Sequence, residues 1–96
     1  MACQVLLEFQ IKDGCHDQLK NRFKEVLADT RDFDGCISLY MIKDRDDPSK
    51  IIIVEMWDTK EQYDKYLEWR VERGDMAILE TMLENPSWRF FDFWGV

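Results

Sequence analysis

The spacing of hydrophobic residues changes along the chain, and each spacing predicts a different kind of element. Apolar residues at every second position are typical of a strand, whereas spacings of three and four residues are typical of one helix face. The predicted order is strand 4–11, helix 15–31, strand 36–43, strand 51–58, helix 60–73, short helix 76–84 and strand 87–94. Gly35 is free to take a left-handed conformation after the first helix, and Asn85-Pro86 is predicted to end the third.

The run Ile51-Ile52-Ile53-Val54 marks the strand around which the rest of the chain is organised. Four consecutive β-branched residues favour a strand, and apolar residues on both parities indicate that both of its faces are covered. Alternation places Glu55 and Trp57 on the same face at the end of this strand. A helix begins directly afterwards, with either Asp58 or Thr59 as its N-cap. A polar group in this position is well placed to line a pocket.

The order β-α-β-β-α-(α)-β predicts an α+β fold, the ferredoxin-like split βαβ arrangement with a four-stranded antiparallel sheet. Ninety-six residues are expected to form one domain, residues 1–96. In such a domain the helices cover one sheet face and water meets the other. Here Ile52, Val54 and Met56 make the second face too apolar for water. We therefore expect a homodimer in which two sheets pack face to face.

Composition narrows the classes of partner. The net charge of −7 argues against binding to nucleic acid and to anionic membranes. Cys3, Cys15 and Cys36 form no C-x-x-C motif, and His16 is the single histidine, so no metal site is expected. Reduced thiols and the lack of a signal-peptide pattern favour a cytoplasmic protein. Aromatic residues make up 14% of the chain, which favours an interface or a cavity for a small aromatic or apolar ligand.

Four short motifs stand at the ends of the predicted elements. They are Lys12-Asp13-Gly14, Phe33-Asp34-Gly35-Cys36, Asp47-Pro48 and Glu55-Met56-Trp57-Asp58-Thr59-Lys60-Glu61. The last matches a Glu-x-Trp pattern followed by a polar helix start. In order and spacing, over about residues 4–93, the chain resembles the antibiotic biosynthesis monooxygenase-like family of the dimeric α/β-barrel superfamily. The resemblance implies that fold, and an activity drawn from a family of quinol and polyketide oxygenases, haem-degrading enzymes and signal-molecule isomerases.

Two positions depart from the family pattern. Nine residues after the Trp the family very often has a His, whereas this chain has Tyr66. The haem-degrading branch has an Asn on the first strand, and the nearest residue here is Leu7. Haem cleavage is therefore not expected, and neither is any other cofactor. Leu7 is instead expected to line the substrate pocket.

The resemblance implies a cofactor-independent monooxygenase acting on a small aromatic diol, quinol or polyketide-like molecule. Such a substrate, once deprotonated, passes an electron to dioxygen, so the protein must hold it, help remove a proton and exclude water. Packing of helix 60–73 over strand 51–58 would bring together the predicted site. In this site Trp57 is predicted to stack on the substrate ring, with Tyr63 beside the ring. Tyr66 hydrogen-bonds a substrate oxygen and Arg70 stabilises the oxyanion. Glu55 takes the proton.

Each of these residues also has a structural interpretation. Trp57, Tyr63 and Tyr66 can be core residues, Arg70 can pair with Glu55 or a surface acid, and Glu55 can pair across a dimer. Without the family's His, a non-catalytic dimeric module that binds a small molecule or acts as a scaffold is the alternative function.

Overall fold

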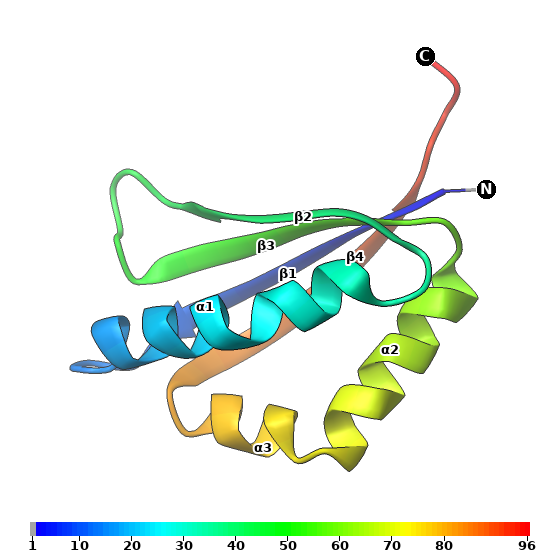
Figure 1. Cartoon of the computed structure of the whole chain (residues 1–96). Coiled ribbons are helices and arrows are strands. Elements are labelled where there is room, and N and C mark those ends of the chain that lie inside the picture. The colour runs from blue at the N-terminus through cyan, green and yellow to red at the C-terminus, as the bar shows by residue number, and fades with distance from the viewer. Residues whose placement is uncertain (1) are drawn as a thin grey trace.

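Four strands form one antiparallel sheet in the order β2-β3-β1-β4, and three helices pack on one side of it (Figure 1). The computed structural model describes residues 2–96. The elements are β1 Cys3–Ile11, α1 His16–Asp32, β2 Cys36–Lys43, β3 Lys50–Trp57, α2 Lys60–Glu72, α3 Asp75–Glu80 and β4 Leu83–Asp92. This confirms the predicted ferredoxin-like fold, with β1 and β3 in the centre of the sheet. None of the described helices is long and apolar enough to cross a membrane.

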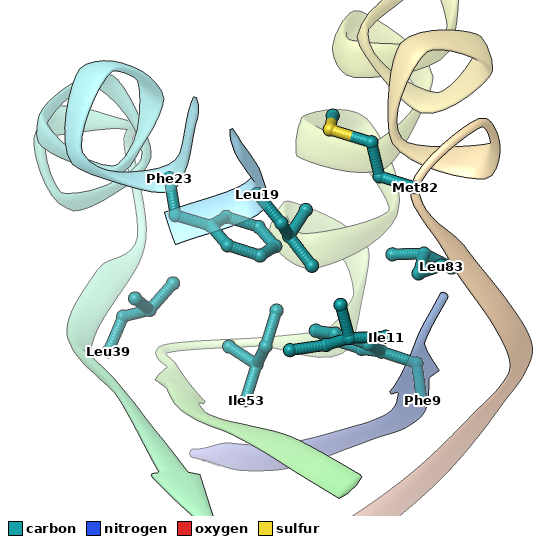
Figure 2. Packing of buried hydrophobic residues seen from close by; sticks show 8 residues of the cluster. All are labelled: Phe9, Ile11, Leu19, Phe23, Leu39, Ile53, Met82 and Leu83. Atoms are coloured by element: carbon teal, nitrogen blue, oxygen red, sulfur yellow. The ribbon is translucent and has the colours of Figure 1, made fainter. Parts of the chain in front are cut away.

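The hydrophobic core lies between the helices and the sheet. Val5, Phe9 and Ile11 share one face of β1, as a spacing of two residues requires, and this face points towards the helices and is buried. Leu19 and Phe23 of α1 reach down onto Phe9 and Ile11 (Figure 2). Full burial of a side chain of this size contributes about 1.5–3 kcal/mol, so this layer supplies much of the driving force for folding.

Two local features orient α2 relative to the sheet. Thr59 is the N-cap of α2, and its Oγ1 accepts a hydrogen bond from the Gln62 backbone N–H at 3.2 Å, which decides between the two predicted caps. Gly35 has a φ of 96°, as its predicted left-handed conformation requires, and a Cβ there would lie 2.5 Å from the Gln62 side chain. The α1–β2 turn therefore packs tightly against the start of α2.

The last strand begins earlier than predicted. The sequence pattern extended the third helix to residue 84 and began the strand at 87, but α3 ends at Glu80 and β4 begins at Leu83. Asn85, with a φ of 56°, and Pro86 lie where the register between β1 and β4 shifts, so they form an irregularity within the strand. A strand at the edge of a sheet tolerates proline and such a bulge, and this was the competing possibility that the prediction missed.

The sheet face away from the helices is apolar and uncovered in the single chain. Tyr40, Val54 and Leu6 lie side by side across β2, β3 and β1, with Ile42 opposite Ile52 beside them. Tyr40 is 54% exposed and Ile42 is 47% exposed. This is the surface on which the expected homodimer depends.

Candidate active site

A cavity of about 50 Å³ lies between the helices and the sheet, beside the end of β3. Its lining includes five of the six predicted site residues, namely Leu7, Glu55, Tyr63, Tyr66 and Arg70. An apolar cavity of about 150 Å³ holds benzene, so the present cavity has room for water but not for an aromatic ring. Met76 and Leu79 of α3 also line it.

Glu55 is the buried acid of this cavity. The residue is only 3% exposed, and burial raises the pKa of its carboxyl to about 7. The indole Nε1 of Trp57 donates a 3.3 Å hydrogen bond to Glu55 Oε1, which partly offsets the effect of burial on the pKa. A carboxyl with a pKa near neutrality can both accept and release a proton at physiological pH.

Trp57 lies next to the cavity but is not part of its lining. The side chain is completely buried, with its ring centroid 5.0 Å from that of Tyr66 and 5.5 Å from that of Tyr63. Phe33 packs edge-on against it from the end of α1. In this arrangement the indole packs against protein rings and orients the Glu55 carboxyl.

Tyr66 belongs to a buried hydrogen-bond network that joins α1 to α2. Its hydroxyl lies 2.8 Å from Thr30 Oγ1 and accepts a 3.1 Å hydrogen bond from Arg70 Nε. Burial raises the pKa of Tyr66, while the hydrogen bonds to Thr30 and Arg70 lower it. If Thr30 donates to Tyr66, the phenol has its own proton left to donate to a group in the cavity.

Arg70 is held by the protein on several sides. Besides Tyr66, its guanidinium donates 2.8 Å hydrogen bonds to Asp75 Oδ2, to the Val26 carbonyl and to Thr30 Oγ1. Four contacts with protein acceptors leave little donor capacity for a ligand. Arg70 does not pair with Glu55 but with Asp75, in a contact that is nearly dry on both sides.

Asp75, the first residue of α3, is a centre of charge that the sequence analysis did not identify. Three arginines surround its carboxylate, since Arg22 and Arg73 each lie 3.2 Å from it and Arg70 lies 2.8 Å from it. Burial alone would raise the pKa of Asp75, but the hydrogen bonds and charges of Arg70 and Arg73 lower it. The carboxylate therefore stays ionised and anchors the start of α3 to α2.

Arg22 and Thr30 are further site residues that the sequence analysis did not assign to the site. Arg22 lines the cavity and contacts Asp75, and its Nε is buried without a hydrogen-bond partner among the described residues. Both residues stand at helical spacing from Leu19 and Phe23 on α1. Polar residues within an otherwise apolar helix stripe were the available signal.

Tyr63 closes the site on the side of β4. It is almost completely buried, and its hydroxyl accepts a 3.0 Å hydrogen bond from Trp88 Nε1. Burial raises the pKa of Tyr63, and the nearby Glu55 raises it further. Tyr63 therefore remains a neutral phenol, able to donate a hydrogen bond but not to act as an anion.

Groups that could ligate a metal do not gather here. Within residues 2–96 no three His, Cys, Asp or Glu side chains are arranged to hold an ion. His16 is exposed at the start of α1, where its Nε2 lies 3.3 Å from Ser49 Oγ. The chemistry available at the cavity is that of Glu55, the two tyrosines and the Arg70–Asp75 pair.

Comparison with known proteins identifies relatives of the chain. Residues 4–69 match the sequence profile of the family described as Antibiotic biosynthesis monooxygenase. No curated protein matches the sequence significantly.

Solved structures share the fold across nearly the whole chain. SnoaB from Streptomyces nogalater, described as a cofactor-independent oxygenase, has a TM-score of 0.85 at 12% identity, and 99% of this chain and 95% of that chain are covered. A conserved protein from Methanosarcina mazei Go1 has a TM-score of 0.86 at 17% identity, covering 95% and 91%. PA3566 from Pseudomonas aeruginosa has a TM-score of 0.79 at 17% identity, covering 98% and 95%. At these identities the likeness establishes the fold alone.

Proposed function

The chain belongs to the antibiotic biosynthesis monooxygenase family, and we propose that it is a cofactor-independent monooxygenase acting on a small aromatic diol, quinol or polyketide-like phenol. The observation that carries this proposal is Glu55, a buried carboxyl with a pKa of about 7 in a cavity that also contains Tyr63 and Tyr66. The description of the structural neighbour SnoaB as a cofactor-independent oxygenase supports it.

In the proposed reaction Glu55 takes the proton from a substrate hydroxyl. The resulting anion transfers one electron to dioxygen, and the two radicals combine at a ring carbon to form a peroxide anion. The protonated Glu55 returns its proton to this anion, which gives a hydroperoxide. Loss of water from the hydroperoxide leaves a carbonyl, so one oxygen atom enters the product and the other leaves as water. The substrate supplies all four electrons, which is why no reducing cofactor is needed.

Tyr66 and Arg70 have separate roles in this proposal. The Tyr66 hydroxyl donates to the substrate oxygen or to the peroxide, whose developing charge it stabilises. Arg70 touches Tyr66 through Nε and holds the phenol in place rather than binding the ligand itself. Trp57 orients Glu55 by its indole N–H. Leu7 and Tyr63 supply cavity wall.

Substrate entry requires the cavity to widen. The helix α3 is the element best suited to move, because it has only six residues and contributes Met76 and Leu79 to the lining. Its anchor is the contact of Asp75 with Arg70 at one end. Closure of α3 over a bound ring would then exclude water from the reaction.

We also propose that the protein is a homodimer, formed through the sheet face that carries Tyr40, Ile42 and Phe91. These side chains are 54%, 47% and 39% exposed in the single chain. A second copy would cover them and bury the half-exposed Ile52 and Met56 between two sheets. Sedimentation equilibrium at micromolar concentration checks this, and a persistent monomer would contradict it.

Oxygen uptake tests the proposed activity. A panel of dihydroquinones and hydroxylated naphthalenes is incubated with the protein in an oxygen-electrode cell, with product carbonyls followed by absorbance. The expected result is protein-dependent uptake that falls on the order of 10²-fold or more in Glu55→Gln. Isotopic label from dioxygen should appear in the product.

A non-catalytic ligand-binding module is the second candidate, favoured by the internal hydrogen bonds of Arg70 and by the small cavity. Saturable binding of the same compounds without any protein-dependent oxygen uptake would support this second candidate and contradict the first.

A further inference from the structure

A second and much larger hollow lies between α1 and the β2–β3 hairpin. Its volume is about 670 Å³, which falls within the range of about 300–1,000 Å³ typical of small-molecule sites. Only Phe23 and Leu27 line both this groove and the Glu55 cavity. The groove is therefore a separate place on the molecule, and what it binds does not depend on the proposed oxygenase activity.

The wall of the groove is largely apolar. Side chains of the central core and of the edge strand β2 form it, among them Phe9, Ile11, Leu19, Leu27, Met41 and Ile51. Leu27, Met41 and Ile51 are only half-buried in the single chain. A ligand with a hydrocarbon body would remove this surface from water, which is favourable at about 25 cal/mol per Å².

The rim of the groove has the opposite charge to the rest of the protein. Lys20, Lys24, Arg31 and Lys43 line it, against the single carboxylate of Asp17, on a chain with a net charge of −7. None of the ion pairs within residues 2–96 involves any of these four cations. Local cations without carboxylate partners beside an apolar wall favour a ligand that combines an anionic head with an apolar body.

The length of the groove indicates the shape of that ligand. It follows α1 from His16 to Arg31, which is about 23 Å at a rise of 1.5 Å per residue. Lys20 and Lys24 are one helical turn apart and lie along the same side of α1.

We propose that the groove between α1 and the β2–β3 hairpin binds a free, elongated amphipathic carboxylate of the class of medium-chain fatty acids. The hydrocarbon chain lies along Leu27, Met41 and Ile51, and the carboxylate lies among the lysines of the rim. A membrane surface is a poorer occupant, because an acidic protein is repelled by anionic headgroups.

Binding of decanoate, compared with 1-decanol, tests this proposal on the full chain. Titration calorimetry gives the affinities, and methyl chemical shifts locate the ligand. Decanoate is expected to bind more tightly than 1-decanol, to lose affinity as salt is added, and to shift the methyl signals of Leu27, Met41 and Ile51.

Matched double variants assign the charge effect to the rim. Lys20→Gln with Lys24→Gln is expected to weaken decanoate binding about fivefold and to leave 1-decanol unchanged. Lys60→Gln with Lys65→Gln removes the same charge from α2, and is expected to leave decanoate affinity within about twofold.

Any one of several results would overturn the proposal. They are equal affinities for the acid and the alcohol, equal losses in the two double variants, and methyl shifts confined to the lining of the Glu55 cavity. Binding to anionic vesicles without binding to dissolved decanoate would also reject it in favour of a membrane surface.

Discussion

The two ends of the helix–sheet interface contain different types of side chain. At one end Phe9, Leu19 and Phe23 form an aliphatic and aromatic cluster without ionisable groups. At the other end Trp57 and Tyr63 pack beside a buried carboxyl. The first end has the composition expected of a core built for stability alone.

The polar end carries groups that a core built only for stability would avoid. A buried ion pair such as Arg70–Asp75 is often no better for stability than apolar residues of the same volume, and a buried carboxyl opposes folding once it ionises. The polar end is also the part of the interface at which we propose the chemistry. The following variants test whether the two ends differ in this way, from the largest expected effect to the smallest.

Replacement of Arg70 by Met should have the largest effect on stability. The change leaves Asp75, Thr30 and the Val26 carbonyl without their 2.8 Å partners, and removal of one member of a buried pair costs about 3–5 kcal/mol. Urea denaturation measures the free energy of unfolding. Arg73→Met removes a half-exposed contact with the same Asp75 and should cost less than about 1 kcal/mol. Similar losses of unfolding free energy in Arg70→Met and Arg73→Met would show that burial of the contact does not determine its contribution to stability.

Glu55→Gln should stabilise the protein, and only at higher pH. The pKa of Glu55 is raised from 4.5 when unfolded to about 7 when folded, so the folded state binds more protons between these values. The wild type therefore loses stability as the pH rises from 4.5 to about 7, by on the order of 3 kcal/mol in total, and the loss stays constant above that. Glutamine has no proton to lose and avoids this loss.

Unfolding of both proteins at pH 4.5 and pH 8 checks the sign. The variant should match the wild type at the lower pH and exceed it at the higher one. Glu61→Gln, which changes an exposed carboxyl on α2, serves as the charge-matched control. A difference between Glu55→Gln and wild type that does not change with pH would mean that Glu55 is not the titrating group.

The aliphatic end was predictable from the sequence and the polar end only in part. Alternation along residues 4–11 and 51–58 predicted which side chains share a face of each strand, because a period of two fixes the parity. The same alternation placed Glu55 at the end of β3. The contact of Arg70 with Asp75 was not predictable, because it depends on how the turn at Gly74 folds α3 back against α2.

Two further outcomes depended on packing that no local pattern contains. Trp57 turned inward among Phe33, Tyr63 and Tyr66, since rings from the end of α1 and from α2 meet there. The β-bulge at Asn85-Pro86 formed because β4 is an edge strand, and the edge position follows only from the order of the whole sheet.

Tyr66→Phe should separate stability from chemistry at the polar end. The phenyl ring keeps its packing, but Arg70 Nε and Thr30 Oγ1 lose a buried partner, for a cost of about 1–3 kcal/mol. Dihydroquinone turnover should fall by on the order of 10²-fold, because the donor to the substrate oxygen is gone. Turnover is also measured in Arg73→Met, which removes a half-exposed contact with Asp75. Unchanged turnover in that variant would show that the loss in Tyr66→Phe is specific to the phenol. Unchanged oxygen uptake in Tyr66→Phe would remove the phenol from the reaction.

The smallest effect should come from removing one methylene group at either of two isoleucines of the aliphatic cluster. Ile53 lines the Glu55 cavity, whereas Ile11 lies in the same aliphatic cluster but does not line that cavity. Ile→Val at either position should cost about 0.5–1.5 kcal/mol, so the two variants are matched in stability. The two variants should differ in ligand binding. Because the Glu55 cavity is too small for an aromatic ring, Ile53→Val should increase the affinity for hydroquinone. Ile11→Val should leave this affinity unchanged. Titration calorimetry measures both affinities. An equal response in the two variants would mean that the ring does not enter beside Glu55 and that the difference between the two ends is one of composition alone.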